Sequence, residues 1–285
     1  MWIRLVVYLG FIPLFYFGLC WYLASGYVKP ARNVAGNLPS SMRVVTIDHE
    51  PHRLVAWASH GLVDGEPQYD TVVILAHGYG GNRDHWEFLI DHLAGRAEIV
   101  APTMQGQDAS LADKVGFGPG EAAEIVSAAR WAREQYDSDP NVVLFGVSLG
   151  GSACWLAAGE HPELFDAVVT EGAFAPLESA SDEFLGFVFR RGSSLMRPVI
   201  WFANMQGGID PSKVRPVDAA KKWNGPALVI HGQEDALFGT HHAEELAAAC
   251  GGELWLVEEL THAQLAGDDP AGLADRILNV ARRSP

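Results

Sequence analysis

Cysteine is scarce in this sequence, and acidic residues are missing from its first part. The three cysteines, Cys20, Cys154 and Cys250, lie far apart, and none belongs to a C-x-x-C pair. This spacing argues against a disulfide framework and against a cysteine zinc site. No Asp or Glu precedes Asp48, so all 35 acidic residues lie between Asp48 and the end of the sequence. A domain so acidic excludes nucleic acid as an expected partner, because the phosphate backbone carries the same sign of charge.

Charge of either sign is absent from Leu5 to Val28. About 20 apolar residues suffice to cross a bilayer core as a helix. Aromatic residues that favour the membrane interface stand near both ends of the run: Trp2, Trp21, Tyr22 and Tyr27. The sequence therefore predicts a transmembrane helix or signal-anchor over residues 1–28, and with it a protein held in the membrane by a single amino-terminal span.

A cleaved secretory signal is the alternative for this segment, and it would leave a secreted protein. Ala24-Ser25-Gly26 offers a small-x-small cleavage site. The apolar run is longer than a usual signal core, which favours the anchor. Arg4 lies on one side of the run and Lys29 on the other, so charge does not indicate the orientation. Residues 29–41, rich in Pro, Gly, Asn and Ser, are typical of a linker.

From residue 42 to residue 285, short apolar strands alternate with helices of ordinary length. Thr71–Ala76 and Pro226–His231 are continuous apolar runs, the kind buried on both faces of a parallel sheet. Arg43–His49 and Arg53–Ser59 are expected to form an antiparallel pair before them. The pattern predicts one α/β domain with a mainly parallel, doubly wound sheet, whose site lies at the carboxyl ends of the strands.

The most informative stretch is the apolar strand that ends in Gly146-Val147-Ser148-Leu149-Gly150 and continues as a helix. In such a turn the serine sits at the apex with its hydroxyl clear of the sheet, and the flanking glycines let strand and helix pass closely. Ser148 is therefore the predicted nucleophile. The alternative is a glycine-rich turn with an incidental serine, in a chain that has 30 glycines.

A serine hydroxyl needs a base, and the base is normally a histidine oriented by a carboxylate. His262 follows the last predicted strand and is the expected base. Asp235 follows the strand before it and is the expected acid, with Glu234 and Glu171 as alternatives. The chain order Ser, Asp, His is the one usual for a strand–turn–helix nucleophile.

The oxyanion of a tetrahedral intermediate needs two aimed donors. The backbone N–H of Leu149, directly after the serine, is one candidate. Tyr79 supplies the other, because it lies in the loop His77-Gly78-Tyr79-Gly80-Gly81 after the Thr71–Ala76 strand. A merely flexible turn is the alternative for this loop.

Together these motifs resemble the α/β-hydrolase fold of serine hydrolases, closest to the esterase, lipase and serine-peptidase-like branches. HGYGG, GVSLGG, HGQED and THAQL occur here in the order of that family, and the likeness covers residues 43–285. The resemblance implies Ser148 as nucleophile, Asp235 as acid and His262 as base, with Tyr79 and Leu149 as oxyanion donors and no cofactor or metal. Family members often carry an Asp and an Arg-Gly-x-Gly stretch where this chain has residues 101–108. That loop usually shapes the pocket, so the departure affects the substrate more than the mechanism.

An insertion at about residues 175–225 stands where this fold often places a helical cap. Its aromatic and Met residues suit either ordinary packing of the cap on the sheet or a pocket for an acyl chain. The expected function is hydrolysis of carboxylic esters or thioesters through an acyl-enzyme, on small-molecule or lipid-like substrates. A peptidase or aminopeptidase-like amide hydrolase and a non-catalytic binding protein of the same fold are the alternatives. The sequence gives no indication of oligomeric state.

Overall fold

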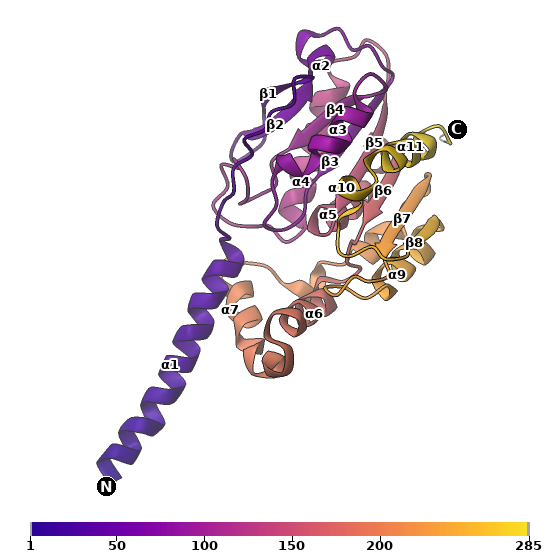
Figure 1. Ribbon diagram of the computed structural model, residues 1–285. Helices are drawn as coiled ribbons and strands as arrows, with labels where there is room; N and C mark the ends of the chain where they lie inside the picture. The colour runs from indigo at the N-terminus through magenta and orange to yellow at the C-terminus, as the bar shows by residue number, and fades with distance from the viewer. Residues whose placement is uncertain (1, 284–285) are drawn as a thin grey trace.

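A computed structural model describes residues 2–283 of the chain (Figure 1). Figure 1 shows an α/β domain from which one long helix, α1 (Trp2–Val28), projects and carries the amino terminus away from the sheet. Helix α7 (Arg197–Gly207) lies beside α1 near the point where α1 joins the domain. The carboxyl terminus lies at the opposite side of the molecule.

Within residues 2–283, eight strands form one sheet in the order β1-β2-β4-β3-β5-β6-β7-β8. Their bounds are β1 (Met42–Ile47), β2 (Leu54–Ser59), β3 (Thr71–Ala76), β4 (Glu98–Pro102), β5 (Asn141–Val147), β6 (Ala167–Glu171), β7 (Ala227–Gly232) and β8 (Glu253–Val257). β2 is antiparallel to both β1 and β4, and the pairs from β4 to β8 are parallel. The predicted antiparallel pair and the mainly parallel sheet are confirmed.

Alternate residues of the central strands point to opposite faces, so the domain has two cores. Val72 and Ile74 pack on one face, and Val73 and Leu75 on the other. The first face is covered by α4 (Pro119–Arg133), α5 (Leu149–Glu160), α8 (Pro216–Ala220) and α9 (His241–Cys250). The second is covered by η1 (Arg83–Trp86), α3 (Glu87–Leu93), α10 (Leu265–Asp268) and α11 (Pro270–Ala281). Helices on both faces make the sheet doubly wound, as predicted. The short α2 (His60–Asp64) and η2 (Pro162–Leu164) are connectors.

The long segment between β6 and β7 is helical and stands where the cap was predicted. It contains α6 (Leu177–Phe189), η3 (Arg190–Met196), α7, η4 (Pro211–Lys213) and α8. Phe187, Trp201 and Met205 are each more than half exposed, so these side chains do not pack on the sheet. The cap thus presents large apolar side chains outward. Its helix α7 lies beside α1 (Figure 1).

Among the described residues, α1 is the one helix long and apolar enough to cross a membrane, over Phe11–Val28 with a mean hydropathy of 1.4. By length and composition it suits a membrane anchor and a signal sequence alike. Its carboxyl end is not free: Cys20, Ala24 and Val28 are buried in a cluster shared with the cap.

Residues 29–41, predicted as a linker, run along the domain and are held there. The guanidinium of Arg32 donates hydrogen bonds to the carbonyl oxygens of Ser110 and Ala112. The backbone N–H of Ala35 donates to a carboxylate oxygen of Asp108 at 2.9 Å. α1 is therefore connected to the domain by a segment with fixed contacts.

Candidate active site

Ser148 stands between β5 and α5 in a backbone conformation that few non-glycine residues adopt, with φ 53° and ψ −121°. The glycines around it are required by close approach. A Cβ on Gly146 would lie 2.7 Å from the carbonyl carbon of Gly150, and a Cβ on Gly150 would lie 2.2 Å from the carbonyl oxygen of Ala76. The G-x-S-x-G pattern therefore has the structural role predicted for it, and the strained turn exposes the hydroxyl to the cavity described below.

The structure brings Ser148, His262 and Asp235 together in one chain of hydrogen bonds. The Oγ atom of Ser148 lies 2.9 Å from Nε2 of His262, and Nδ1 of His262 lies 2.6 Å from Oδ2 of Asp235. The other oxygen of Asp235 accepts from the backbone N–H groups of Leu237 at 2.8 Å and Phe238 at 2.9 Å. These bonds fix the carboxylate so that a single oxygen faces the imidazole.

Asp235 is held as a carboxylate although its side chain is only 1% exposed. Burial by itself would raise its pKa, but the hydrogen bond and charge of His262, with the two backbone N–H groups, outweigh burial and keep the pKa below its usual value. An ionised carboxylate at Nδ1 keeps the Nδ1 proton in place, which leaves Nε2 as an acceptor toward Ser148.

The two alternative acids lie elsewhere. Glu234 is exposed. Glu171, at the end of β6, is fully buried, and one of its oxygens accepts from the backbone N–H of Leu265 at 3.0 Å. Its contact is thus with the segment after His262, and Glu171 helps to position that loop. Burial raises the pKa of Glu171 to about 7, with a smaller contribution in the same direction from the charge of Asp235.

The wild type should lose stability as pH rises from 4.5 to 7, which are the usual pKa of glutamate and the folded-state pKa of Glu171. Replacing Glu171 with glutamine should reduce this loss. Because the folded-state pKa is raised, the unfolded chain loses this proton first, and the free energy of unfolding falls with rising pH by about 3 kcal/mol across that interval. Glutamine does not ionise, so the variant lacks this loss. Urea unfolding of both proteins at several pH values measures the effect, and identical pH dependence in the two would contradict it.

The loop after β3 lies against the serine. A Cβ on Gly78 would lie 3.1 Å from Cβ of Ser148, so a side chain at this position would crowd the nucleophile. His77 holds the loop: its Nδ1 lies 3.0 Å from the carbonyl oxygen of Gly78, and its Nε2 accepts from the backbone N–H of Met104 at 3.3 Å. Burial lowers the pKa of His77 to about 4, so it stays neutral and supports the loop. These contacts give His77 a role in shaping the loop.

In front of Ser148 lies a cavity of about 210 Å³. Most of its lining is apolar, and large side chains come to it from α1, the cap and several strand ends: Tyr27, Phe117, Phe174, Leu177, Phe184 and Phe238. Tyr79 and Leu149, the expected oxyanion donors, also line it next to Ser148.

Tyr27, near the carboxyl end of α1, is a pocket residue that sequence reasoning missed. Its ring centroid lies 4.8 Å from that of Phe117 and 5.0 Å from that of Phe184, and the Tyr79 hydroxyl donates to its carbonyl oxygen at 2.9 Å. The only signal in the sequence was an aromatic residue at the end of an apolar run, which equally suits the membrane interface.

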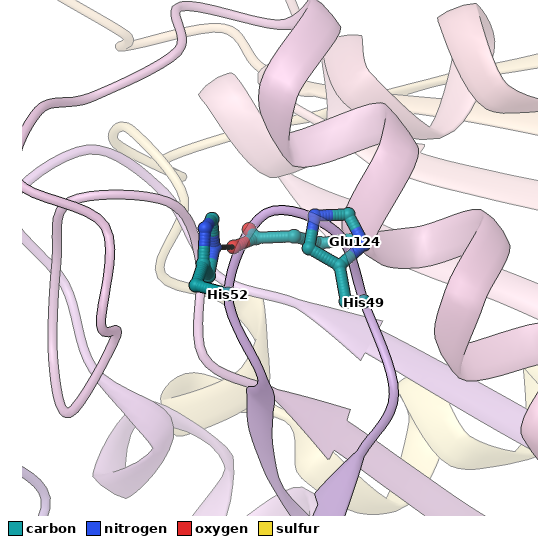
Figure 2. Close-up of side chains that lie close together, drawn as sticks. All are labelled: His49, His52 and Glu124. Carbon is teal, nitrogen blue, oxygen red and sulfur yellow. Dashed lines mark hydrogen bonds and ion pairs between the residues drawn. The ribbon is translucent and has the colours of Figure 1, made fainter.

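Two His/Glu clusters among the described residues have the spacing of metal ligands, and no member of either lines the cavity. One is Glu183, His241 and His242, at the base of the cap. Both ring nitrogens of His242 are already engaged, one with the N–H of Ala175 at 3.2 Å and the other with Glu183 at 3.1 Å. The other cluster is His49, His52 and Glu124, on the β1–β2 loop and α4 (Figure 2).

Solved structures with the same fold include an esterase of Pyrococcus furiosus, with a TM-score of 0.73 and 18% sequence identity, covering 90% of this chain and 98% of that one. A membrane phospholipase A described as a bacterial virulence factor matches with a TM-score of 0.62 and 16% identity, covering 99% of this chain and 97% of that chain. Such identities establish the fold and leave the substrate open.

Among curated proteins, a probable 1-acylglycerol-3-phosphate O-acyltransferase of Oryza sativa subsp. japonica is 26% identical over 78% of this chain and 52% of its own length. A pimeloyl-[acyl-carrier protein] methyl ester esterase of Klebsiella pneumoniae is 31% identical over 41% of this chain and 42% of its own length. The chain thus spans about half the length of these relatives. The family model for the alpha/beta hydrolase fold matches residues 71–213, from β3 into the cap. The chain belongs to the α/β hydrolase fold family, as its motifs predict.

Proposed function

We propose that this protein is a serine hydrolase that cleaves carboxylic esters or thioesters through an acyl-enzyme on Ser148. The observation that carries the proposal is the unbroken chain from Ser148 Oγ to His262 to Asp235, with distances of 2.9 Å and 2.6 Å, at an apolar cavity. Nucleophilic acyl transfer requires a hydroxyl bonded to a base and a third group that orients the base, and these three side chains are arranged in that way.

In the proposed reaction the Ser148 oxygen attacks the carbonyl carbon of the ester, and Nε2 of His262 takes the hydroxyl proton. The backbone N–H groups of Tyr79 and Leu149 stabilise the oxyanion of the tetrahedral intermediate. When this intermediate collapses, the bond from the carbonyl carbon to the alcohol or thiol breaks, and the leaving group takes the proton from His262. Water then attacks the acyl-enzyme, with His262 again as the base. The second intermediate collapses, releases the acid and restores Ser148. Protein groups supply each proton transfer, so no cofactor is part of the proposal.

We infer that the preferred substrates carry a lipid-like acyl chain. The cavity beside Ser148 is walled by apolar side chains, and burying an apolar chain there is favourable by about 25 cal/mol per Å² of surface removed from water. The relatives described above support this class, because a phospholipase A, a methyl ester esterase and an acyltransferase all handle acyl groups by name.

We also infer that the active protein keeps α1 as a membrane anchor. Cleavage near Ala24-Ser25-Gly26 would remove Cys20 and Ala24, both fully buried against the cap, and would cut next to Tyr27 in the pocket wall. Loss of buried apolar contacts destabilises what packs on them. The exposed Trp201 and Met205 of the cap lie beside α1, where they would meet the same membrane surface.

A peptidase has less support than an esterase. Recognition of a charged amino terminus needs an acidic partner, and no Asp or Glu is found among the described residues that line the cavity. A non-catalytic binding protein would not require the bonded set of Ser148, His262 and Asp235.

The proposal is tested by labelling the full-length protein, in detergent micelles, with a fluorophosphonate probe and mapping the adduct by peptide mass spectrometry. The expected result is one adduct, on Ser148, that heat denaturation before labelling prevents. Folded protein that does not react, or an adduct on another serine, would overturn the proposed nucleophile. A panel of esters with acyl chains of increasing length then tests the substrate class.

Replacing Tyr27 with alanine should raise KM for a long-chain ester by roughly tenfold while changing KM for an acetyl ester little, since lost apolar contact costs about 1–3 kcal/mol of binding. Tyr22→Ala is the matched control, because Tyr22 lies on the same helix and is 73% exposed. Equal changes in KM for both esters in the Tyr27 variant would remove Tyr27 from acyl-chain recognition.

A further inference from the structure

A second polar site lies outside the cavity, between the loop that joins β1 to β2 and helix α4. His49 and His52 come from the loop, and Glu124 comes from α4. Figure 2 shows His52 and the Glu124 carboxylate facing each other, with the His49 ring beside the Glu124 side chain. None of these residues has a part in the proposed hydrolysis.

Glu124 is the unusual member of the cluster. Its side chain is fully buried, its Oε1 lies 3.3 Å from Nε2 of His52, and its Oε2 has no hydrogen-bond partner. One turn earlier on α4, Glu121 is also buried, but both of its oxygens accept backbone N–H groups, from Gly116 at 2.8 Å and Gly118 at 2.7 Å. A buried carboxylate oxygen without a partner is costly, and a second carboxylate nearby adds to the cost. A bound cation would offset both.

The spacing of the three side chains suits a metal ion better than an ion pair. A charge-assisted N–H···O bond is usually about 2.7–2.9 Å long, and the His52–Glu124 distance of 3.3 Å exceeds this. Neighbouring ligand atoms of a tetrahedral Zn²⁺ site, with bonds of about 2.0–2.1 Å, are about 3.3 Å apart. Each of the three side chains offers a ligand atom, and these atoms all lie within 4.8 Å of one another.

The surroundings also fit a metal site. Nδ1 of His49 lies 2.9 Å from Oγ of Ser127, which leaves Nε2 of His49 as the ligand and gives it the outer-shell partner that metal-binding histidines normally have. The His52 side chain is 17% exposed, so an ion can enter from solvent. Two imidazoles and one carboxylate are a ligand set of Zn²⁺, with water in the fourth position.

We propose that His49, His52 and Glu124 bind a Zn²⁺ ion that ties the β1–β2 loop to α4. The ion joins the edge of the sheet to a helix of its face, so binding stabilises the fold by linkage. The three residues lie outside the cavity that contains Ser148, and the proposal is independent of the proposed hydrolysis.

The test uses full-length protein without a polyhistidine tag, in detergent, stripped with EDTA and dialysed. Zn²⁺ is added, and bound metal per chain and the melting temperature are measured. Co²⁺ is used in parallel, because its visible absorption reports a four-coordinate site with nitrogen ligands. The variants are His52→Gln, Glu124→Gln and Ser127→Ala at the proposed site, and His241→Gln in the second cluster, at the base of the cap. His161→Gln is the matched control, since His161 lies 3.2 Å from Glu163 in an exposed pair of the same kind.

The expected result is one Zn²⁺ per chain, a higher melting temperature with Zn²⁺, and the Co²⁺ absorption, in both the wild type and His161→Gln. Loss of an outer-shell partner weakens metal binding by about 10–100-fold, which is the effect expected for Ser127→Ala, and loss of a ligand should weaken it by more. No retained metal and no shift in the wild type would overturn the proposal. The proposal would also be wrong if Glu124→Gln and His52→Gln still bound Zn²⁺ and His241→Gln did not. That result would place the ion at the base of the cap.

Discussion

Replacing Ser148 with alanine should lower kcat for ester hydrolysis by roughly 10⁶-fold, the loss that follows when a nucleophile is removed from a Ser-His-Asp set. Without Oγ there is no acyl-enzyme, and His262 has no hydroxyl proton to take. The remaining rate would come from substrate binding and the oxyanion donors alone. The measurement is hydrolysis of a chromogenic ester by wild type and variant in the same detergent, with melting temperatures recorded for both.

Ser152→Ala is the matched control for this experiment. Ser152 lies one turn further along α5, is fully buried, and its Oγ exchanges hydrogen bonds with the backbone of Phe174 at 2.9 Å and 3.0 Å. Its loss should lower the melting temperature and leave kcat within about tenfold of wild type, since the reacting atoms are untouched. If Ser148→Ala kept more than about a hundredth of the wild-type rate, another residue would have to be the nucleophile.

The sequence predicted the sheet well because its strands carry strong local signals. Thr71–Ala76 is observed with the predicted bounds, and the antiparallel pair before it differs by only one or two residues at the ends. Thr71–Ala76 and Leu54–Ser59 are apolar strands that are almost wholly buried, whereas the edge strand Met42–Ile47 is buried only at its two ends. Short helices such as α2 and α10 were not predicted, because one turn of helix leaves too little periodicity to detect.

The arrangement around Ser148 was also predictable to a large extent. Parallel strands bring their carboxyl ends to one edge, so Ser148, Asp235 and His262, each after a strand, had to lie near one another. The choice of Asp235 over Glu234 depends on which side chain turns inward, and this is fixed by the backbone N–H groups of Leu237 and Phe238. The direction in which a side chain points is set by the backbone geometry of the loop, and the sequence alone indicates that geometry only weakly.

The contribution of α1 to the pocket could not be predicted from the sequence. Tyr27 is separated from Tyr79 and Phe117 by long stretches of chain, and no periodic pattern links them. The same apolar residues serve a membrane span and a packed helix end, because hydrophobicity alone does not say what covers a surface. Only the structure shows that Cys20 and Ala24 are buried, whereas Phe11 and Phe15 are about 70% exposed.

Asp235→Asn should lower kcat by roughly 10⁴-fold while leaving the fold intact, because the imidazole would adopt the wrong tautomer. The geometry gives the reason. One oxygen of Asp235 accepts the N–H groups of Leu237 and Phe238, so the asparagine oxygen would remain there and its NH₂ group would face His262. Nδ1 of His262 would then have to accept, its proton would move to Nε2, and Nε2 would no longer accept the proton of Ser148.

Glu234→Gln is the matched control for Asp235→Asn, since it makes the same carboxylate-to-amide change at the exposed neighbouring position. Its kcat and its rate of reaction with a fluorophosphonate should stay within about twofold of wild type, because surface substitutions away from the site have small effects. In Asp235→Asn both rates should fall together, since both depend on proton removal from Ser148, while KM for the ester should change little. A variant that kept its labelling rate, or a Glu234→Gln protein that lost it, would show that Asp235 is not the residue that orients His262.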